Sequence, residues 1–205
     1  MKNFSLGLIS LFLLASSFII YTGKETFKVK ASESEVHWYA TKVTGKHDGV
    51  VSLKSGEIVV EKGALTGGSF VVDMTSIKVL DLEEGSNMNN KLTNHLKSPD
   101  FFDVEKHGEA SFKVTSAKKT GQQATSDKAL EYEVTGDLTI KGISNPLTFK
   151  VYVKTEGSDA TARGTLVFDR SKYDVKYGSE TFFGNLGDKA IYNDVTLKIE
   201  LKASK

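Results

Sequence analysis

Hydrophobic and polar residues alternate along most of the chain after residue 35, and this period of two is typical of strands buried on one face. The alternation is longest over residues 132–140 and 147–153, and the Gly- and Pro-containing segment 142–146 between them predicts the turn of a hairpin. Shorter alternating or apolar runs occupy residues 36–40, 50–53, 58–60, 70–74, 110–114, 166–168 and 195–201. We therefore predict an all-β domain of about eight antiparallel strands.

Strands of this length and number favour a closed, extended barrel, because closure removes exposed sheet edges. An open β-sandwich is the alternative architecture. Gly136 lies in the middle of a predicted strand, where a glycine indicates a bend or a close approach of another segment. The interior of an eight-stranded barrel is wide enough for side chains alone or for one slim ligand.

The connections between strands have their own patterns. Met88, Leu92 and Leu96 are spaced by four, which predicts a short helix with Asn87 or Asn89 as its N-cap and Pro99 as its stop. We interpret residues 24–30 as a polar connection, 54–56 as a turn, and 118–128 as a polar hairpin loop.

The N-terminal segment resembles a targeting element, with Lys2 followed by an apolar run over residues 6–20 and small residues at 15–17. We interpret residues 1–23 as a signal peptide or an N-terminal anchor, because the run is short for a membrane-spanning helix of about 20 residues. Both readings predict an exported domain, periplasmic or secreted, over residues 31–203.

Composition excludes several classes of function. Lys+Arg 27 against Asp+Glu 26 gives a net charge of +1, with both signs interleaved, so the chain has no field that would gather nucleic acid. Cysteine is absent, which rules out disulfides, thiol nucleophiles and thiolate metal sites. We expect no cofactor.

Several segments together resemble the YceI-like family of extracytoplasmic, lipocalin-like polyisoprenoid-binding proteins. Each motif alone is mostly turn and strand chemistry, but their order and spacing run from Ser34 almost to the C-terminus. The matching segments are 34–38 (SEVHW), 42–49 (KVTGKHDG), 67–74 (GGSFVVDM), 95–103 (HLKSPDFFD), 135–142 (TGDLTIKG), 168–170 (FDR) and 194–197 (DVTL).

The resemblance implies an extended antiparallel lipocalin-like barrel with a short helix in the connection after the third strand. It also implies an isoprenoid or another long apolar lipid in the lumen, and it transfers no catalytic residue and no metal ligand to this chain.

The binding hypothesis rests on large side chains that alternation places on one face, together with a Phe after the helix and an Arg after a strand. A guanidinium can orient a polar head group, although such a residue more often bridges loops. The predicted ligand-binding residues are Trp38, Phe70, Val72, Phe102, Phe112, Tyr132, Leu138, Ile140, Phe149, Phe168 and Arg170.

The four histidines match no zinc-binding template, and we expect them to hydrogen-bond turns and backbone carbonyls. Two of them meeting at the barrel mouth is the alternative. Asp100 and Asp103 flank Phe101 and Phe102, and we interpret this turn as a plug for the barrel rather than a pair of catalytic carboxylates.

The sequence therefore predicts an extracytoplasmic carrier for a long apolar lipid, such as a polyisoprenoid or an isoprenoid quinone, with transient membrane contact among its expected interactions. The alternatives are a structural or stress-related envelope module with a filled barrel and, less favoured, a lipid-modifying enzyme that uses His47, His95 or Asp100. The oligomeric state is left open.

Overall fold

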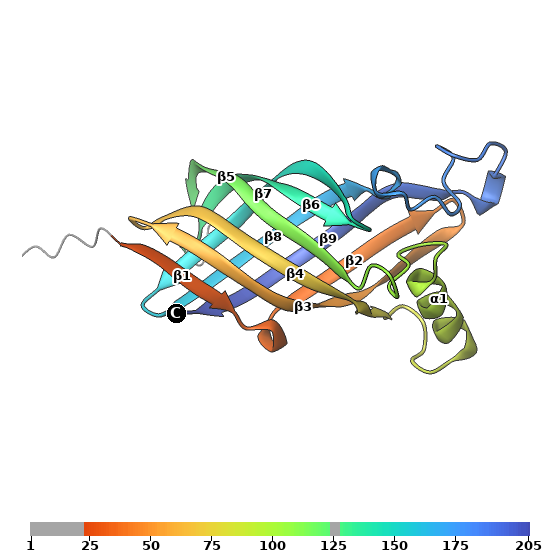
Figure 1. Ribbon diagram of the computed structural model, residues 1–205, viewed down its shortest axis with the longest axis horizontal. Coiled ribbons are helices and arrows are strands. Elements are labelled where there is room, and N and C mark those ends of the chain that lie inside the picture. The colour runs from red at the N-terminus through yellow and green to blue at the C-terminus, as the bar shows by residue number, and fades with distance from the viewer. Residues whose placement is uncertain (1–22, 124–127) are drawn as a thin grey trace, which may run out of the picture.

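The chain forms one closed antiparallel β-barrel, as predicted (Figure 1). The computed structural model describes residues 23–123 and 128–205. The sheet order is β1-β3-β2-β9-β8-β7-β6-β5-β4, and pairing of β3 with β4 closes the ring and excludes an open sandwich. The strands are β1 (Lys24–Val29), β2 (Glu35–Lys42), β3 (Gly45–Glu61), β4 (Ala64–Val79), β5 (Glu109–Gln123), β6 (Leu130–Ile140), β7 (Ile143–Glu156), β8 (Asp159–Asp169) and β9 (Ile191–Ser204).

The nine strands occupy eight positions around the barrel, because β1 and β2 are two parts of one interrupted strand. β1 pairs with the C-terminal half of β3 and β2 with its N-terminal half, and both also pair with β9. A short 3₁₀ helix, η1 (Ala31–Glu33), separates them. The prediction of a polar connection over residues 24–30 was wrong: Phe27 of β1 is fully buried, and two apolar residues, Phe27 and Val29, in so short a segment did not reveal a strand.

β3 is a single strand, so the predicted turn at residues 54–56 was also wrong. The register shifts between Leu53 and Ser55, which leaves Lys54 without an opposite residue and makes a β-bulge. Gly56 is required by a close contact instead of a turn, because a Cβ there would lie 2.8 Å from Cδ1 of Phe70. His47 and Asp48 also belong to this strand.

Two further predicted connections are strands. Residues 118–123 continue β5, so that part of the expected loop was wrong; residues 124–127 of that prediction lie outside the described part of the chain. The turn expected over residues 142–146 is restricted to Lys141 and Gly142, both with positive φ, and Pro146 lies inside β7 opposite Asp137. Proline is tolerated there because β7 pairs with β8 only from Val151 onward.

The helix α1 (Asn87–Lys97) follows β4, the third full position of the barrel wall, and lies against one end of the barrel (Figure 1). Ser86 is its N-cap, accepting a hydrogen bond from the Asn89 backbone N–H, so the predicted asparagine caps were wrong. Asn89 is buried and its Nδ2 donates to the carbonyl oxygens of Val79 and Leu82, both at 3.0 Å. Leu92 and Leu96 pack on the core, but Met88 is 68% exposed and leaves the predicted stripe.

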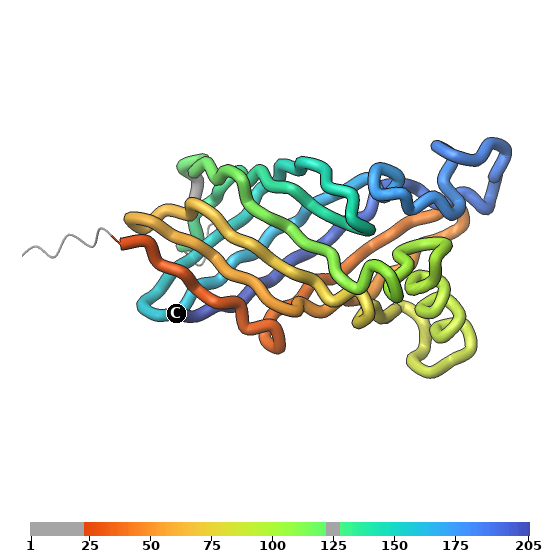
Figure 2. Tube along the Cα trace, in the orientation of Figure 1, coloured from red at the N-terminus to blue at the C-terminus, as the bar shows by residue number. Residues whose placement is uncertain are grey.

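A long connection joins β8 to β9 beside α1. It runs from η2 (Arg170–Tyr173) through η3 (Gly187–Lys189) to β9. Both described termini lie at the opposite end of the barrel (Figure 2). Among residues 23–123 and 128–205, no helix has the length and apolar character needed to cross a membrane.

Glu131 of β6 is a buried carboxylate on the outer wall. It accepts hydrogen bonds from Tyr152 Oη at 2.7 Å and Thr120 Oγ1 at 2.8 Å, and Lys150 Nζ lies 3.1 Å away. The bonds from Tyr152, Thr120 and Lys150 lower the pKa of Glu131. This cluster ties β5, β6 and β7 together across the ladder.

Replacing Gly49 by Ala tests the closest approach in the wall. A Cβ at Gly49 would overlap the Lys78 carbonyl oxygen and lie 2.7 Å from Trp38 Cζ2, so we expect a loss of about 3 kcal/mol in the free energy of unfolding. The matched control is Gly67→Ala, whose Cβ would lie 3.7 Å from Val59 Cβ and should change stability little. Equal urea midpoints for the two variants would contradict the assignment.

Replacing Glu131 by Gln tests the outer-wall cluster. Because the folded pKa is lowered, the carboxylate contributes stability above its ordinary value of 4.5, and that contribution is lost as the pH falls through the lowered value. The difference in unfolding free energy between wild type and Glu131→Gln should be largest at neutral pH and shrink below pH 4.5. Urea unfolding at a series of pH values measures it; a pH-independent difference is the contrary result.

Candidate functional site

The barrel is hollow in its middle and packed at both ends. At the end that contains the termini, Phe27, Ile58, Val60, Tyr132 and Ala203 are each 2% exposed or less. At the α1 end, Tyr173 and Val175 are equally buried. Between these layers the inward side chains of the strands are only partly buried although they point away from the outside: Phe70, Val72, Phe112, Phe149, Leu197 and Ile199.

These side chains enclose an apolar cavity of about 200 Å³. A void that holds one water needs about 10–15 Å³ of space for its centre, so this cavity exceeds a packing defect by more than tenfold. Its lining on β9 runs from Ile191 to Leu201, which is roughly 33 Å of strand. With a strand tilt of about 40°, the cavity follows the axis for roughly 25 Å. It is therefore long and narrow.

Ten of the eleven predicted ligand-binding residues line this cavity: Trp38, Phe70, Val72, Phe102, Phe112, Leu138, Ile140, Phe149, Phe168 and Arg170. The structure places Tyr132 elsewhere, in the packed layer at the end with the termini, where it borders a second, separate pocket. That these residues contact a ligand stays a prediction.

Sequence reasoning missed other residues of the lining. Leu197 and Ile199 of β9 face the cavity, and the same alternation that identified the strand would have included them. Leu96 and Phe101 border it at the α1 end. Phe101 is 7% exposed, and its ring centroid lies 6.5 Å from that of Phe102, so the two rings lie together at this end of the cavity; that they plug the barrel stays a prediction.

Arg170 is buried at the α1 end of the barrel, and its guanidinium binds backbone carbonyls. Its Nε, Nη1 and Nη2 donate to the carbonyl oxygens of Tyr192, Val175 and Ile191 at 3.2, 2.9 and 3.0 Å. Burial lowers the pKa of Arg170, opposed by the charge of Asp169. These contacts fit the loop-bridging alternative: the guanidinium fork fixes the connection between β8 and β9 beside the cavity.

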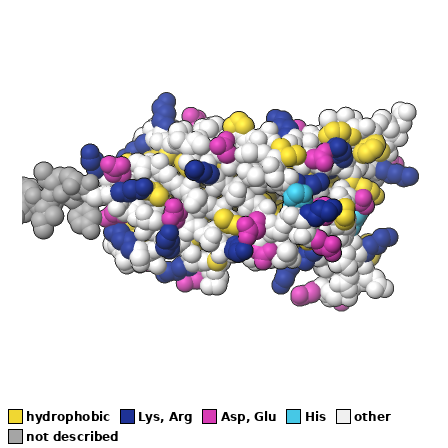
Figure 3. Space-filling model, in the orientation of Figure 1, with side chains coloured by type: hydrophobic (Ala, Val, Ile, Leu, Met, Phe, Trp, Pro, Cys, Tyr) yellow, Lys and Arg dark blue, Asp and Glu magenta, His cyan; other side chains and the backbone are white. Residues whose placement is uncertain are grey.

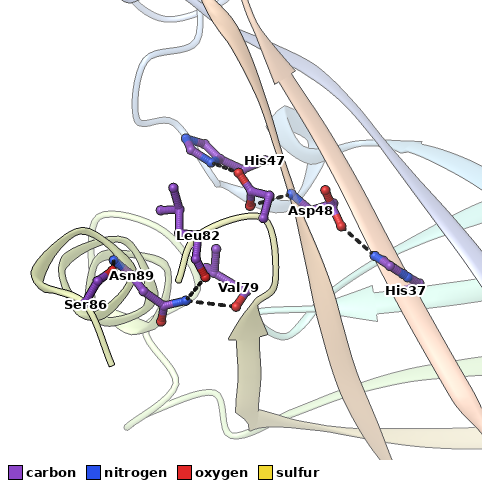
Figure 4. Close-up of polar contacts among 8 residues, drawn as sticks. His37, His47, Asp48, Val79, Leu82, Ser86 and Asn89 are labelled. Atoms are coloured by element: carbon purple, nitrogen blue, oxygen red, sulfur yellow. Dashed lines mark hydrogen bonds and ion pairs between the residues drawn. The ribbon is translucent and has the colours of Figure 1, made fainter. Parts of the chain in front are cut away.

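Three of the four histidines pair with separate carboxylates, not with the backbone carbonyls that we expected. His37 Nε2 lies 2.9 Å from Asp48 Oδ2, across the ladder from β2 to β3 (Figure 4). His47 Nδ1 lies 2.8 Å from Asp81 Oδ2, and His95 Nε2 lies 3.2 Å from Asp100 Oδ2. In the part of the chain that the structure describes, no three His, Asp or Glu side chains are placed to hold a metal ion.

The His95–Asp100 pair lies outside the lumen and faces aromatic rings. The His95 ring makes edge contacts with Phe101 and Tyr177, at centroid distances of 5.0 and 4.5 Å. The nearby Ser98 hydroxyl donates to the His95 carbonyl oxygen instead of its imidazole, so it is not aligned as a nucleophile with a base.

The ladder of the barrel wall is interrupted beside the cavity. β7 and β8 pair from Val151–Gly164 to Glu156–Asp159, and no pairing continues from there toward α1. Gly164 marks the end of pairing, where a Cβ would lie 2.9 Å from the Lys150 carbonyl oxygen. Beyond it, Asn145 Nδ2 donates to the Lys172 carbonyl at 3.1 Å and joins β7 to η2.

The model of the YceI-like domain family matches residues 27–203, and the chain belongs to that family. Two UPF0312 proteins are similar: one from Photorhabdus laumondii is 32% identical over 61% of this chain and 59% of its own length, and one from Pseudomonas putida W619 is 37% identical over 47% of each. The chain thus spans about half to three fifths of these curated relatives.

Solved structures share the fold. BcnA of Burkholderia cenocepacia superposes with a TM-score of 0.65 at 22% identity, over 86% of this chain and 99% of BcnA. A domain from Saccharophagus degradans described as polyisoprenoid binding has a TM-score of 0.64 at 15% identity, over 87% of this chain and 97% of that one. At these identities the likeness shows the fold alone.

Replacing Arg170 by Met tests its role as a clamp. Three backbone carbonyls would lose their donor, and we expect a loss of about 3 kcal/mol in the free energy of unfolding, with faster amide exchange over residues 175–193. Lys189→Met, at an exposed position of the same connection, is the control. Unchanged stability and exchange in Arg170→Met would contradict the clamp role.

Proposed function

We propose that this protein is an extracytoplasmic binding protein that carries a long apolar lipid, a polyisoprenoid or an isoprenoid quinone, inside its barrel. The observation that supports it most is the long, apolar cavity between two packed layers. A structural module with a filled barrel would have packed this space. The neighbour from Saccharophagus degradans, described as polyisoprenoid binding, supports the same ligand class.

In this proposal the affinity comes from burial of the apolar lipid chain inside the barrel. Each methylene moved from water into an apolar site contributes about 0.8 kcal/mol, so a five-carbon isoprene unit contributes roughly 3–4 kcal/mol before ordering costs. Arg163 and Arg170 are the charged residues that border the cavity, but the Arg163 guanidinium lies over the Tyr152 ring on the outer wall and Arg170 binds three carbonyls. Selectivity then depends on the width and length of the cavity.

Binding rather than catalysis is the proposed activity, since His95 and Asp100 lie outside the lumen and His47 bonds to Asp81. Export rests on the leader prediction, which falls on residues outside the described part of the chain. In this proposal the barrel shields the lipid from water between membranes.

Replacing Ala162 by Trp tests the cavity as the binding site. The indole would displace about three methylene groups of a bound lipid, so we expect roughly 60-fold weaker binding and a matching loss of the lipid recovered by organic extraction and mass spectrometry of natively purified protein. Val167→Trp, which is exposed on the outside of the same strand, is the matched control. No apolar lipid from wild type, even after incubation with a membrane extract, would refute the proposed function.

A further inference from the structure

The described residues expose their large hydrophobic side chains almost entirely around the α1 end of the barrel. Eight of them lie on the connections and strand ends there, and the ninth, Val167, lies on the outer wall of β8. Hydrophobic side chains gather at that end of the face drawn in Figure 3. The eight residues, here called the rim, are Val43, Leu80, Met88, Ile143, Tyr177, Phe182, Phe183 and Tyr192.

Three of the eight rim residues, Tyr177, Phe182 and Phe183, come from the connection between β8 and β9, and the backbone of this connection holds their rings in place. The amides of Phe182 and Phe183 donate to the Ser179 carbonyl oxygen at 3.1 and 3.0 Å, and Ser179 is fully buried. The amide of Ile191 donates to Gly178 at 2.8 Å. These rings remain 42% and 48% exposed in an ordered turn, which indicates a surface built to meet another apolar phase.

The rim is continuous with the α1 end of the cavity. The Tyr177 ring lies 5.3 Å from the ring of Phe101, which lines the cavity beside Phe102. Ile191 also lines the cavity, below Gly178. An apolar chain leaving the lumen at this end would therefore meet apolar side chains up to the surface.

The charge of the connection between β8 and β9, which carries Tyr177, Phe182 and Phe183, favours a neutral apolar partner. Between residues 171 and 190, three lysines (Lys172, Lys176, Lys189) balance three carboxylates (Asp174, Glu180, Asp188), which leaves no net charge. Lys176 Nζ lies 5.4 Å above the Phe182 ring, an arrangement in which the ring inserts while the ammonium stays in water.

We propose that the rim is a membrane-docking surface whose aromatic side chains enter the interfacial region of a phospholipid bilayer. Tyr and Phe on separate connections suit this fluid phase, where each ring finds its own depth, better than one complementary protein face. The inference rests on the proposed function, because a lipid that dissolves in bilayers is collected and released at their surface. Docking places the cavity end against that surface.

Flotation with phosphatidylcholine vesicles tests the proposal, in variants with identical N-termini so that any contribution of residues 6–20 cancels. Wild type is expected to float, and Phe182→Ser combined with Phe183→Ser should reduce the bound fraction roughly tenfold. Val167→Ser, which removes an equally exposed apolar side chain from the wall, should bind like wild type. Adding salt should change binding little, since the connection that carries Phe182 and Phe183 has no net charge.

Equal vesicle binding by wild type and the double variant would overturn the proposal. So would a wild-type dimer that the double variant converts to a monomer in sedimentation, because the rim would then be an interface between copies. Matching urea midpoints establish that the variants fold. A variant from which lipid is still extracted but which no longer floats would show that docking and lipid binding are separate. Vesicle binding by wild type with an empty lumen would refute the proposed function alone.

Discussion

Closure of the backbone hydrogen-bond ladder is the constraint on which this molecule depends. Once β3 pairs with β4, the eight positions of the wall fix the width of the barrel, and inward side chains occupy the space inside it. The two ends fill it, with Phe27 and Ile58 at one and Tyr173 and Val175 at the other. The middle does not, although Phe70, Phe112 and Phe149 point into it. The apolar hollow therefore lies between these two packed layers.

Glycines and bulges give the wall the shape that this hollow needs. Gly49 and Gly56 admit the Trp38 and Phe70 rings against the backbone, and a Cβ at Gly136 would lie 2.5 Å from the Lys113 carbonyl oxygen. The bulge at Lys54 lets β3 bend around the barrel without losing its partners. The large rings can therefore lie along the wall instead of across the lumen, which keeps the cavity long and apolar.

The α1 end combines structural and surface roles. Arg170 lies at the start of the connection between β8 and β9 and binds the carbonyl oxygens of Val175 and Ile191. The same connection exposes Tyr177, Phe182 and Phe183. Asn89 similarly fixes the segment between β4 and α1. Buried polar clamps with satisfied hydrogen bonds hold irregular segments in place, and this order makes it possible to present apolar rings to the surroundings at a fixed position.

The sequence alone determined the strand class, the inward face of most strands and the family, because alternation and local motifs are properties of neighbouring residues. It identified Gly136 as a site of close approach and ten residues of the cavity lining. Only the tertiary structure decided that Gly56 and Pro146 lie within strands, since their meaning depends on which segment lies opposite. It also decided that Arg170 binds carbonyls some twenty residues away, that Tyr132 packs away from the cavity, and that the lumen is hollow. Whether inward side chains touch across a barrel depends on its closure, which is a relation between distant strands that no local pattern records.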